Sequence, residues 1–352
     1  MENVKLTLNG KDITVENTAR FLGVTFDRRL TWKPHIDKVV EKCNKRMNIL
    51  RVLSGTRWGS SKAMLLIVYK AMIRSVIDYG SIAYDTASNR TKSRLDEIQA
   101  KALRICCGAL RGTPTSALQV ECGQPPLRLR RLRMMTDYAI KIQSLPDHPA
   151  THVVEDCWSI HYGRYDTGRE PFQVKTSKVL KGSKVEIYPK IPTEAAPWKS
   201  STSTTPVLKN VLKPPRDKVR KTILDTWQEE WDYSSTGGFY NEIQPIVDYK
   251  VKFTCKPRAK EVLITRFRLG HACLNNFLYR MGLKDNSECE LCKEEEDVEH
   301  FFLRCPLQDR LRENLTAICQ AHDKRPNIKN FLTVTECINV ISDSLLPQDR
   351  FL

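Results

Sequence analysis

Four residues near the C-terminal end of the sequence have the types and the spacing of a metal site: Cys289-x2-Cys292-x7-His300-x4-Cys305. Three thiolates and one imidazole are a complete ligand set for one tetrahedral zinc ion. The two residues between the first two cysteines allow a tight turn that directs both sulfur atoms to one point. Four protein ligands leave no position for a catalytic water, so the pattern predicts one structural Zn2+ and no hydrolytic centre.

The segments around these ligands suit the same site. The acidic stretch 293–297 is long enough for the chain to turn back, and 298–303 begins a helix that would bring His300 and Cys305 to the opposite side. Pro306 ends that helix because proline lacks a backbone donor. The alternative is a chance cluster, since the chain has 12 cysteines and 7 histidines and a free cysteine is often a small buried hydrophobe.

The other cysteines are scattered, most of them on apolar helical faces. The N-terminal residues have no apolar core of the length that a signal peptide needs. We therefore expect an intracellular protein in a reducing compartment, with no preference between nucleus and cytoplasm, in which these thiols are structural. No apolar run reaches the ~18 residues of a membrane span, so we expect no membrane partner.

The balance of charge is strongly basic. Lysine and arginine number 57 against 41 acidic residues, which gives a formal net charge of +16 and a pI of about 9.3. Such a surplus indicates a polyanionic partner, most often nucleic acid, although charge alone is nearly as consistent with a merely basic protein. The predicted helix 33–53 places part of this charge opposite its apolar residues. Its basic residues are Lys38, Lys42, Lys45 and Arg46.

A second basic segment, 127–135, has four arginines in six positions: Arg128, Arg130, Arg131 and Arg133. We expect its leucines and methionines to pack inward. Because few acidic residues lie nearby in the sequence, the segment predicts an exposed row of groups that bind phosphate. A solvated helix face with acidic partners is the alternative.

The N-terminal residues alternate in polarity, as strands do. Segments 4–8 and 12–15 flank Asn9-Gly10, a pair typical of a hairpin turn, and 20–26 adds a third strand. The rest of the pattern has a helical period, which predicts a mostly α chain with a small N-terminal antiparallel sheet, an α+β class.

The second predicted helix starts at Ser60 or Ser61 as its N-cap and is nearly all apolar to Ile77, so we expect it at the centre of a bundle. Trp227 and Trp231 lie four residues apart on one helical face and are expected in the core. The predicted helices span 33–53, 60–77, 93–107, 127–135, 216–231 and 259–279, with turns across 108–126.

Composition divides the chain into parts. The polar, low-complexity stretch 199–206 cannot bury enough surface to order itself, which predicts a linker. The predicted units are a β-hairpin remnant over 1–30, a helical bundle over 31–147, a polar linker over 148–215, a helical zinc-binding domain over 216–320 and a C-terminal tail or helix over 321–352.

Several phrases occur together in one order: Arg20 to Trp32, Ile77-Asp78-Tyr79-Gly80, Thr113 to Leu118 with Gly123 to Leu127, Trp227 to Trp231, Arg266 to His271, and the Cys-Cys-His-Cys set. The first resembles the phrase after the palm domain in reverse transcriptases of non-LTR (LINE-type) retrotransposons of the I and Jockey groups. The next phrases resemble the thumb of these enzymes, and the last three resemble their C-terminal zinc-binding segment. Together they cover about 20–145 and 215–310.

The resemblance implies a thumb-like helical bundle that packs against the template and primer backbone, and a zinc segment that binds element RNA or target DNA. On this basis the helices 33–53 and 127–135 contact nucleic acid, and Arg266, Arg268 and His271 extend the contact toward the zinc module. For His271, a ring satisfied by a nearby backbone carbonyl is at least as good an interpretation.

The catalytic parts of those polymerases are missing from the sequence. It has no Tyr/Phe-x-Asp-Asp turn to hold two magnesium ions, and the carboxylates of a ribonuclease H domain cannot be placed in the short linker. We therefore expect no enzyme activity but a zinc-dependent remnant that binds the RNA or DNA backbone, within an element ribonucleoprotein. The alternatives are a domesticated protein-interaction module and a partial fragment of a longer active polymerase. The sequence does not indicate an oligomeric state.

Overall fold

The computed structural model describes residues 6–13, 16–144, 170, 172–185 and 206–351. Most of these residues are helical, and the described strands lie at the N-terminal end. The predicted mostly α class with a small antiparallel N-terminal element is therefore confirmed. Within the described residues, no helix is both long enough and apolar enough to cross a lipid bilayer.

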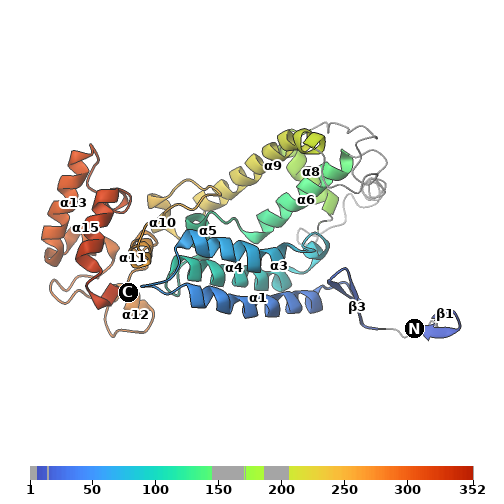
Figure 1. Cartoon of the computed structure of the whole chain (residues 1–352). Helices are drawn as coiled ribbons and strands as arrows, with labels where there is room; N and C mark the ends of the chain where they lie inside the picture. Colours follow the sequence, from blue (N-terminus) through green and yellow to red (C-terminus); the bar gives the residue numbers. More distant parts are fainter. Residues whose placement is uncertain (1–5, 14–15, 145–169, 171, 186–205, 352) are drawn as a thin grey trace.

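The helices form a bundle between the N-terminal hairpins and a C-terminal helical group (Figure 1). In the bundle α1 (Lys33–Leu53) packs against both α3 (Ser75–Asp78) and α4 (Asn89–Cys107). At the opposite end from the hairpins, α13 (Asp309–Ala321) packs on α15 (Thr335–Leu345).

Two short antiparallel hairpins begin the chain: β1 (Leu6–Leu8) pairs with β2 (Lys11–Ile13), and β3 (Thr18–Phe21) pairs with β4 (Val24–Asp27). The first turns at Asn9 and Gly10, as predicted. The second hairpin occupies the range 20–26, where a single strand was predicted, so that prediction is wrong. Leu22 and Gly23 have φ values of 45° and 81°, the backbone of a tight turn that reverses the chain inside the predicted strand.

Helix α1 matches its predicted range. Its apolar residues at helical spacing are buried, with Ile36, Cys43 and Met47 wholly inaccessible to solvent. A loop precedes the helix, and the Asp27 carboxylate stabilises this loop by accepting a hydrogen bond from the Trp32 N–H (2.8 Å). The lysines opposite the apolar face are exposed, as the period indicates.

The predicted apolar helix to Ile77 has three parts: α2 (Lys62–Val68), the π-helical turn η1 (Tyr69–Arg74) and α3. Its N-terminus differs from the prediction, because Ser61 takes the N-cap position without a side-chain cap. The Lys62 N–H donates instead to the carboxylate of Glu261 (2.7 Å), 199 residues away in the sequence. The carboxylate of Glu261 therefore caps the N-terminus of α2, a role that was predicted for Ser60 or Ser61.

The region between α4 and α6 (Leu127–Gln143) contains a helix that the sequence did not predict. Turns were expected across 108–126, but the middle of that range forms α5 (Thr115–Cys122). The helix is short and ends at Gly123, whose φ is 60°. A Cβ at Gly123 would lie 2.4 Å from the Lys250 carbonyl oxygen, so glycine here allows a close approach of two backbones.

The described part of the predicted linker 148–215 is helical and packed. Helix α8 (Phe172–Gly182) packs on α6, and α9 (Pro206–Asp232) begins inside the predicted linker and packs on both. Leu180 and Leu212 are buried in the same apolar core as Val219. These stretches are therefore part of the fold and not a polar tether; the low-complexity residues 199–205 lie outside the described residues.

The C-terminal helices surround an aromatic cluster in which Phe267 lies 5.1 Å from Phe302 and 5.8 Å from Phe351, between ring centroids. The prediction of a single helix over 259–279 is wrong, because the helical path is interrupted near Gly270, whose φ is 71°. The elements here are α10 (Gly238–Ile243), α11 (Arg258–Arg268), α12 (Asn275–Arg280), η4 (His300–Arg304), η5 (Pro306–Gln308), α14 (Ile328–Phe331) and η6 (Asp349–Phe351).

Helix α11 joins the C-terminal helices to the bundle. Arg258 donates to the Ile105 carbonyl (3.4 Å), and a Cβ at Gly108 would lie 2.6 Å from Val262. Buried apolar residues of both parts form one core, which includes Trp227 and Trp231, each 2% exposed as predicted for core residues. The division into domains stays a prediction, but the bundle and the C-terminal helices are in direct contact.

Candidate metal centre and nucleic-acid interface

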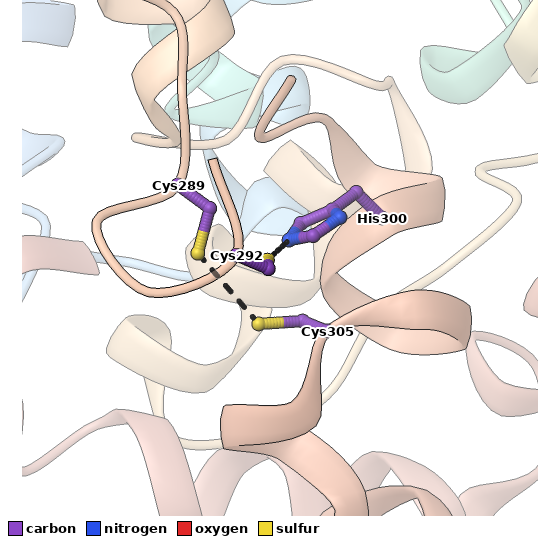
Figure 2. A group of neighbouring side chains, drawn as sticks. All are labelled: Cys289, Cys292, His300 and Cys305. Carbon is purple, nitrogen blue, oxygen red and sulfur yellow. Dashed lines mark hydrogen bonds between the residues drawn. The ribbon is translucent and has the colours of Figure 1, made fainter. Parts of the chain in front are cut away.

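The four predicted metal ligands converge (Figure 2). The ligand atoms of Cys289, Cys292, His300 and Cys305 all lie within 4.8 Å of one another. The Cys289 and Cys305 sulfur atoms are 3.8 Å apart, and the Cys292 sulfur is 3.3 Å from His300 Nε2. Around a tetrahedral zinc ion with Zn–S of ~2.3 Å and Zn–N of ~2.0 Å, neighbouring ligand atoms lie about 3.5–3.8 Å apart. The residues therefore fit a metal ion of that kind.

Two backbone turns place these atoms. In the first, the Cys289 N–H donates to the Glu294 carbonyl (2.7 Å) and the Lys293 N–H donates to the Cys289 carbonyl (3.1 Å). Lys293 has a φ of 60°, which reverses the chain directly after the second cysteine. In the second, η4 begins at His300, and the Cys305 N–H donates to the His300 carbonyl (2.8 Å). The imidazole and the last thiol thus come to the cluster from one helical turn.

Glu294 orients the imidazole from outside the cluster. Its carboxylate lies 3.2 Å from His300 Nδ1, so the Nδ1 proton is donated to it and Nε2 is left toward the thiols. A carboxylate in this position fixes the tautomer of a ligating histidine and makes the ring a stronger ligand. From the sequence, the acidic stretch 293–297 is expected only to form a turn. Which acid reaches His300 depends on the left-handed residue Lys293, which sequence alone did not predict.

The pKa values of two thiols diverge. Burial raises the pKa of Cys289, but hydrogen bonds from the Cys292 and Leu291 backbone and from His300 outweigh it and lower the pKa to about 6. Burial raises the pKa of Cys305 to about 11, and the neighbouring Cys289 adds to that rise. One sulfur is therefore ready as a thiolate at neutral pH, and a bound cation would favour ionisation of the others.

The metal loop is tied to the helices around it. Glu296 is 5% exposed, and its carboxylate accepts a hydrogen bond from the Asn275 N–H (2.8 Å) and pairs with Arg350. The Asn275 side chain donates to the Glu288 carbonyl (2.7 Å). The loop thus contacts both the start of α12 and the C-terminal turn η6.

The arginines of α6 do not form the predicted exposed row. Arg130 donates to both carboxylate oxygens of Asp78 (2.7 and 2.6 Å). Arg131 is 4% exposed and pairs with Asp85 (3.1 Å), which also binds Lys175 (2.6 Å). The prediction is wrong for these two residues, because acids distant in the sequence but adjacent in space hold both guanidinium groups.

Arg128 and Arg133 lie nearer the surface. Arg128 pairs with Glu230 of α9, and Arg133 lies 3.6 Å from Asp137 and faces the ring of Tyr249. All four arginines therefore have a carboxylate neighbour, which is the alternative that the sequence left open.

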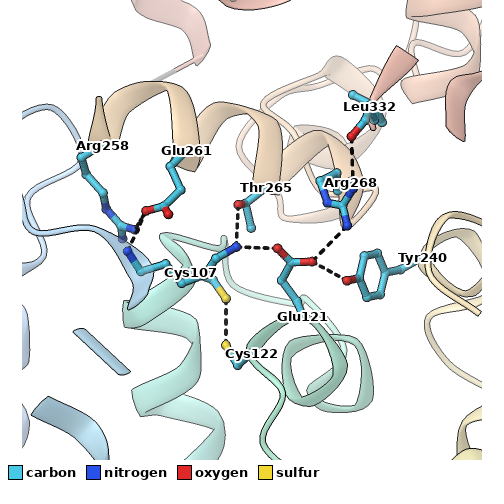
Figure 3. Close-up of polar contacts among 10 residues, drawn as sticks. Cys107, Glu121, Cys122, Tyr240, Arg258, Glu261, Thr265, Arg268 and Leu332 are labelled. Atoms are coloured by element: carbon cyan, nitrogen blue, oxygen red, sulfur yellow. Dashed lines mark hydrogen bonds and ion pairs between the residues drawn. The ribbon is translucent and has the colours of Figure 1, made fainter. Parts of the chain in front are cut away.

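A buried polar network surrounds Glu121 (Figure 3). Its carboxylate accepts hydrogen bonds from Lys62 and from the Tyr240 hydroxyl, and it lies 3.5 Å from Arg268. Burial favours the neutral forms, but Lys62 and Arg268 hold the pKa of Glu121 below its usual range, and Glu121 raises the pKa of Lys62. Glu121 and Lys62 are therefore both charged at neutral pH. Arg268, 3% exposed, is occupied by this network and does not face solvent, contrary to its predicted role.

Arg266 and His271 are also held inside the chain. Arg266 is 6% exposed and donates to the Gly108 carbonyl (2.9 Å). His271 Nδ1 lies 2.7 Å from the Leu269 carbonyl oxygen, as the structural interpretation of this histidine expected. The continuous basic surface predicted from Arg266 to the zinc module is therefore absent from the described structure.

Helix α1 presents its predicted lysines to solvent. Lys38, Lys42 and Lys45 are exposed, and Lys45 pairs with Glu41 (2.7 Å) on the same helix. Arg46 is turned inward, where it donates to the Met72 carbonyl (2.6 Å) in the π-helical turn η1. The exposed charge of α1 is thus carried by its lysines.

A pocket of about 370 Å³ lies where these lysines meet the second hairpin and α3. Arg20, Lys38 and Lys42 line it, and none of its described lining residues is acidic. His35 also lines it. His35 Nδ1 accepts a hydrogen bond from the Thr25 N–H (3.2 Å), so Nε2 carries the proton, and this buried atom has no acceptor among the described residues. Burial lowers the pKa of His35, with Lys38 adding to the effect, so the ring is a neutral donor.

The chain is similar to proteins of mobile elements. It is 22% identical over 314 residues to the "Retrovirus-related Pol polyprotein from type-1 retrotransposable element R1" of Bradysia coprophila, covering 88% of this chain and 26% of that protein. It is also 22% identical over 315 residues to a second R1 Pol polyprotein, from Nasonia vitripennis, covering 89% of this chain and 66% of the relative. A shorter match, 28% over 104 residues, joins it to the "RNA-directed DNA polymerase from mobile element jockey" of Drosophila melanogaster, covering 30% of this chain and 11% of the relative.

No protein-family model matches the chain, and no solved structure matches it. The chain spans about a quarter of the first relative and two thirds of the second. The resemblance expected from the sequence phrases is nevertheless confirmed: the chain is related over most of its length to Pol polyproteins of R1 elements, and over about a third of its length to a jockey polymerase, both from non-LTR retrotransposons.

Proposed function

We propose that this chain is a zinc-stabilised nucleic-acid-binding segment derived from a retrotransposon reverse transcriptase. It contacts the phosphate backbone of RNA or DNA through the N-terminal half of α1, and its partner complex is an element ribonucleoprotein. The names of its relatives, which are Pol polyproteins and RNA-directed DNA polymerases, support a nucleic-acid partner.

The observation that carries this proposal is the pocket at the second hairpin. Lys38 and Lys42 have no ion-pair partner in the part of the chain that the structure describes, in contrast to the arginines of α6. His35 also lines this pocket, and its buried Nε2–H has no acceptor among the described residues. The three cations around one pocket match an anionic oxygen ligand such as a backbone phosphate.

The metal in this proposal has a structural role. Three thiolates and one imidazole complete a tetrahedral set, and Glu294 supplies the outer hydrogen bond that such sites use. The thiolate-rich donor set favours Zn2+ over Mg2+ or Ca2+, which prefer oxygen ligands. The ion would hold the loop 288–305 against α11 and α12.

This function assigns no nucleotidyl transfer to the chain. Since the chain spans only about a quarter of one R1 relative, a longer protein that adds a palm domain would make the same segment part of an active polymerase. The phosphate contacts proposed for α1 would serve either protein.

Charge reversal at the pocket tests the proposal. Lys38→Glu with Lys42→Glu should weaken binding of a labelled oligonucleotide, measured by fluorescence anisotropy. The melting temperature should change little, because both side chains are exposed and the variant loses one hydrogen bond, from Lys38 to the Thr25 hydroxyl (3.2 Å). The matched control is Lys218→Glu with Lys221→Glu, which makes the same charge change on exposed positions of α9. Equal losses in both variants would show that only net charge matters, and no loss at α1 would refute the proposed interface.

The metal loop favours a second candidate function. Between Asp285 and Glu299 the sequence has eight acidic residues and one lysine, a charge that repels phosphate, and Leu291 at the tip of the knuckle is 56% exposed. These features suit a basic protein partner better than nucleic acid. Recovery of one stoichiometric protein by the zinc-loaded chain, resistant to nuclease and lost in Leu291→Asp, would support this function.

A further inference from the structure

Trp58 is a large aromatic side chain that the fold leaves in solvent. It lies in the loop between α1 and α2 and is 76% exposed, whereas the other described tryptophans, Trp32, Trp227 and Trp231, are at most 5% exposed. An indole has a large apolar surface, and exposing it is unfavourable unless a ligand covers it.

Gly55 lies against the indole, and Gly59 packs closely on the backbone of Gly55. A Cβ at Gly55 would lie 2.5 Å from Cε2, 2.8 Å from Nε1 and 2.9 Å from Cδ2 of Trp58. Because Cδ2 belongs to the interior bond of the ring system, similar distances to all three atoms place Gly55 over a ring face and not at the ring edge. A Cβ at Gly59 would lie 2.3 Å from the Gly55 carbonyl oxygen, which itself accepts the Gly59 N–H (2.8 Å). The backbone therefore supports one face of the indole, and the high exposure belongs to the rest of the ring.

The surroundings of Trp58 are cationic. A pocket of about 620 Å³ is lined by Trp58 and Met64 together with Arg57, Lys256 and Arg258, and none of its described lining residues is acidic. Arg258 is fixed in the wall by its pair with Glu261 (2.8 Å), while Lys256 is exposed. An aromatic face beside positive groups is the composition of a site that stacks a base and binds its phosphates.

The exposed face of α1 connects this site to the basic pocket. Lys38, Lys42 and Lys45 are followed at helical spacing by Ile49 and Val52, which are 41% and 68% exposed. All five lie on one face, because their spacing of three or four residues returns to the same side of a helix. From Lys38 to Val52 this face is about 21 Å long, at ~1.5 Å per residue. Its basic half begins at the proposed phosphate site, and its apolar half ends next to the loop that contains Trp58.

We propose that Trp58 is a stacking platform for an unpaired base of a single-stranded nucleic acid whose backbone follows the lysines of α1. This rests on the proposed function and narrows its ligand class. A duplex keeps its bases paired and stacked on one another and can offer only phosphates, whereas a single strand can place a base on the open indole face. The positive charge of the pocket favours this occupant over an apolar protein surface, because the described lining residues include cations and no acid.

Oligonucleotides with and without bases test the platform. The zinc-loaded full chain is titrated with labelled oligothymidylate and with an abasic oligonucleotide of equal length. Trp58→Ala should weaken binding of oligothymidylate roughly 5- to 150-fold and leave the abasic strand unaffected. Trp58→Phe should restore most of the loss. Tyr233→Ala is the matched control, because that ring is 89% exposed and lies outside the pocket.

Fluorescence provides an independent measurement. Oligothymidylate should quench the tryptophan emission of the wild-type chain, and the quenched fraction should disappear in Trp58→Phe. Unchanged affinity in Trp58→Ala, or an equal loss for both oligonucleotides, overturns the platform while the phosphate interface stands. If the wild-type chain binds neither oligonucleotide, the proposed function itself fails and takes the platform with it. Self-association of the wild-type chain that Trp58→Ala abolishes would show that a second copy covers the indole, and would also overturn it.

Discussion

At the scale of single residues, the candidate metal site consists of four ligands, Cys289, Cys292, His300 and Cys305, and one outer carboxylate, Glu294, that orients the imidazole. The four ligands lie within seventeen residues, and because such short-range spacing limits their geometry strongly, the sequence could predict them. The outer partner Glu294 could not be selected among its acidic neighbours, because the choice depends on the left-handed backbone of Lys293. Of the residues that line the basic pocket, Lys38 and Lys42 were predicted as nucleic-acid contacts, but the pocket itself was not, because Arg20 reaches it from the second hairpin.

Removal of the outer carboxylate should weaken the metal site without destroying it. Glu294→Gln keeps all four ligands but loses the charged acceptor for His300 Nδ1, so we expect metal affinity to fall roughly 10- to 100-fold. Competition with a chromophoric zinc chelator measures this. Glu295→Gln removes an equal charge from the exposed neighbouring residue and should change the affinity little. Similar losses in both variants would mean that loop charge, and not the hydrogen bond, matters.

The arginines of α6 should differ in how much they contribute to the free energy of unfolding, because they differ in burial. Arg131→Ala removes a buried partner of Asp85 and should lower the free energy of unfolding by about 2–4 kcal/mol. Arg128→Ala removes an exposed pair and should cost about 0.5 kcal/mol or less. Urea denaturation monitored by circular dichroism compares the two. Equal costs would contradict the paired geometry, since an exposed row of arginines would show small effects throughout.

At the scale of elements, hydrophobic period predicted the long helices and missed what depends on distant contacts. Helix α1 matched its prediction because its apolar stripe is complete within one segment. The hairpin turn at Gly23 and the break at Gly270 each depend on a positive φ that polarity patterns do not report. The N-terminus of α2 is capped by Glu261 from another part of the chain, which no local signal could predict.

The Lys62–Glu121 pair gives the packing of α2, α5 and α11 a dependence on pH. Folding lowers the pKa of Glu121 from its ordinary value of 4.5, so its contribution to stability is present above that value and is lost as pH falls through the folded pKa. Glu121→Gln should remove this acid dependence and leave Lys62 buried without its carboxylate. We expect a cost of roughly 3–5 kcal/mol at neutral pH.

The variant should also reverse the pH trend on the alkaline side. Without Glu121, burial should lower the pKa of Lys62, so the unfolded chain would bind more protons and stability should rise with pH. Thermal unfolding across pH measures both effects. A variant as stable as the wild type, with the same acid profile, would show that the network does not hold these helices together.

At the scale of the whole molecule, the metal loop and the bundle are coupled through α11. Phe302 lies on the turn η4 between two of the metal ligands and packs on Phe267 of α11. Helix α11 also places Glu261 and Arg268 against the bundle. From the sequence we predicted two units separated by a polar linker. The contacts between α11 and the bundle could not be predicted, because they join residues far apart in the chain. We now expect their stabilities to be linked.

Metal removal tests this linkage. Chelation should increase hydrogen exchange first in the loop 288–305 and then in α11, and should lower the melting temperature of the whole chain. His300→Ala should behave like the chelated protein. Exchange confined to the loop, with an unchanged transition in the bundle, would instead support two independent units joined by a linker.

The measurement that tests the proposed phosphate interface most directly is the salt dependence of binding. The affinity of the zinc-loaded chain for a single-stranded oligonucleotide would be measured from roughly 50 to 200 mM salt. Each phosphate neutralised should contribute about −0.7 to the slope of log affinity against log salt, so contacts from Arg20, Lys38 and Lys42 predict a slope of about −2 or steeper. Lys38→Glu with Lys42→Glu should make the slope shallower by about 1.4. A flat dependence, or a slope that this variant leaves unchanged, would contradict a phosphate interface on α1.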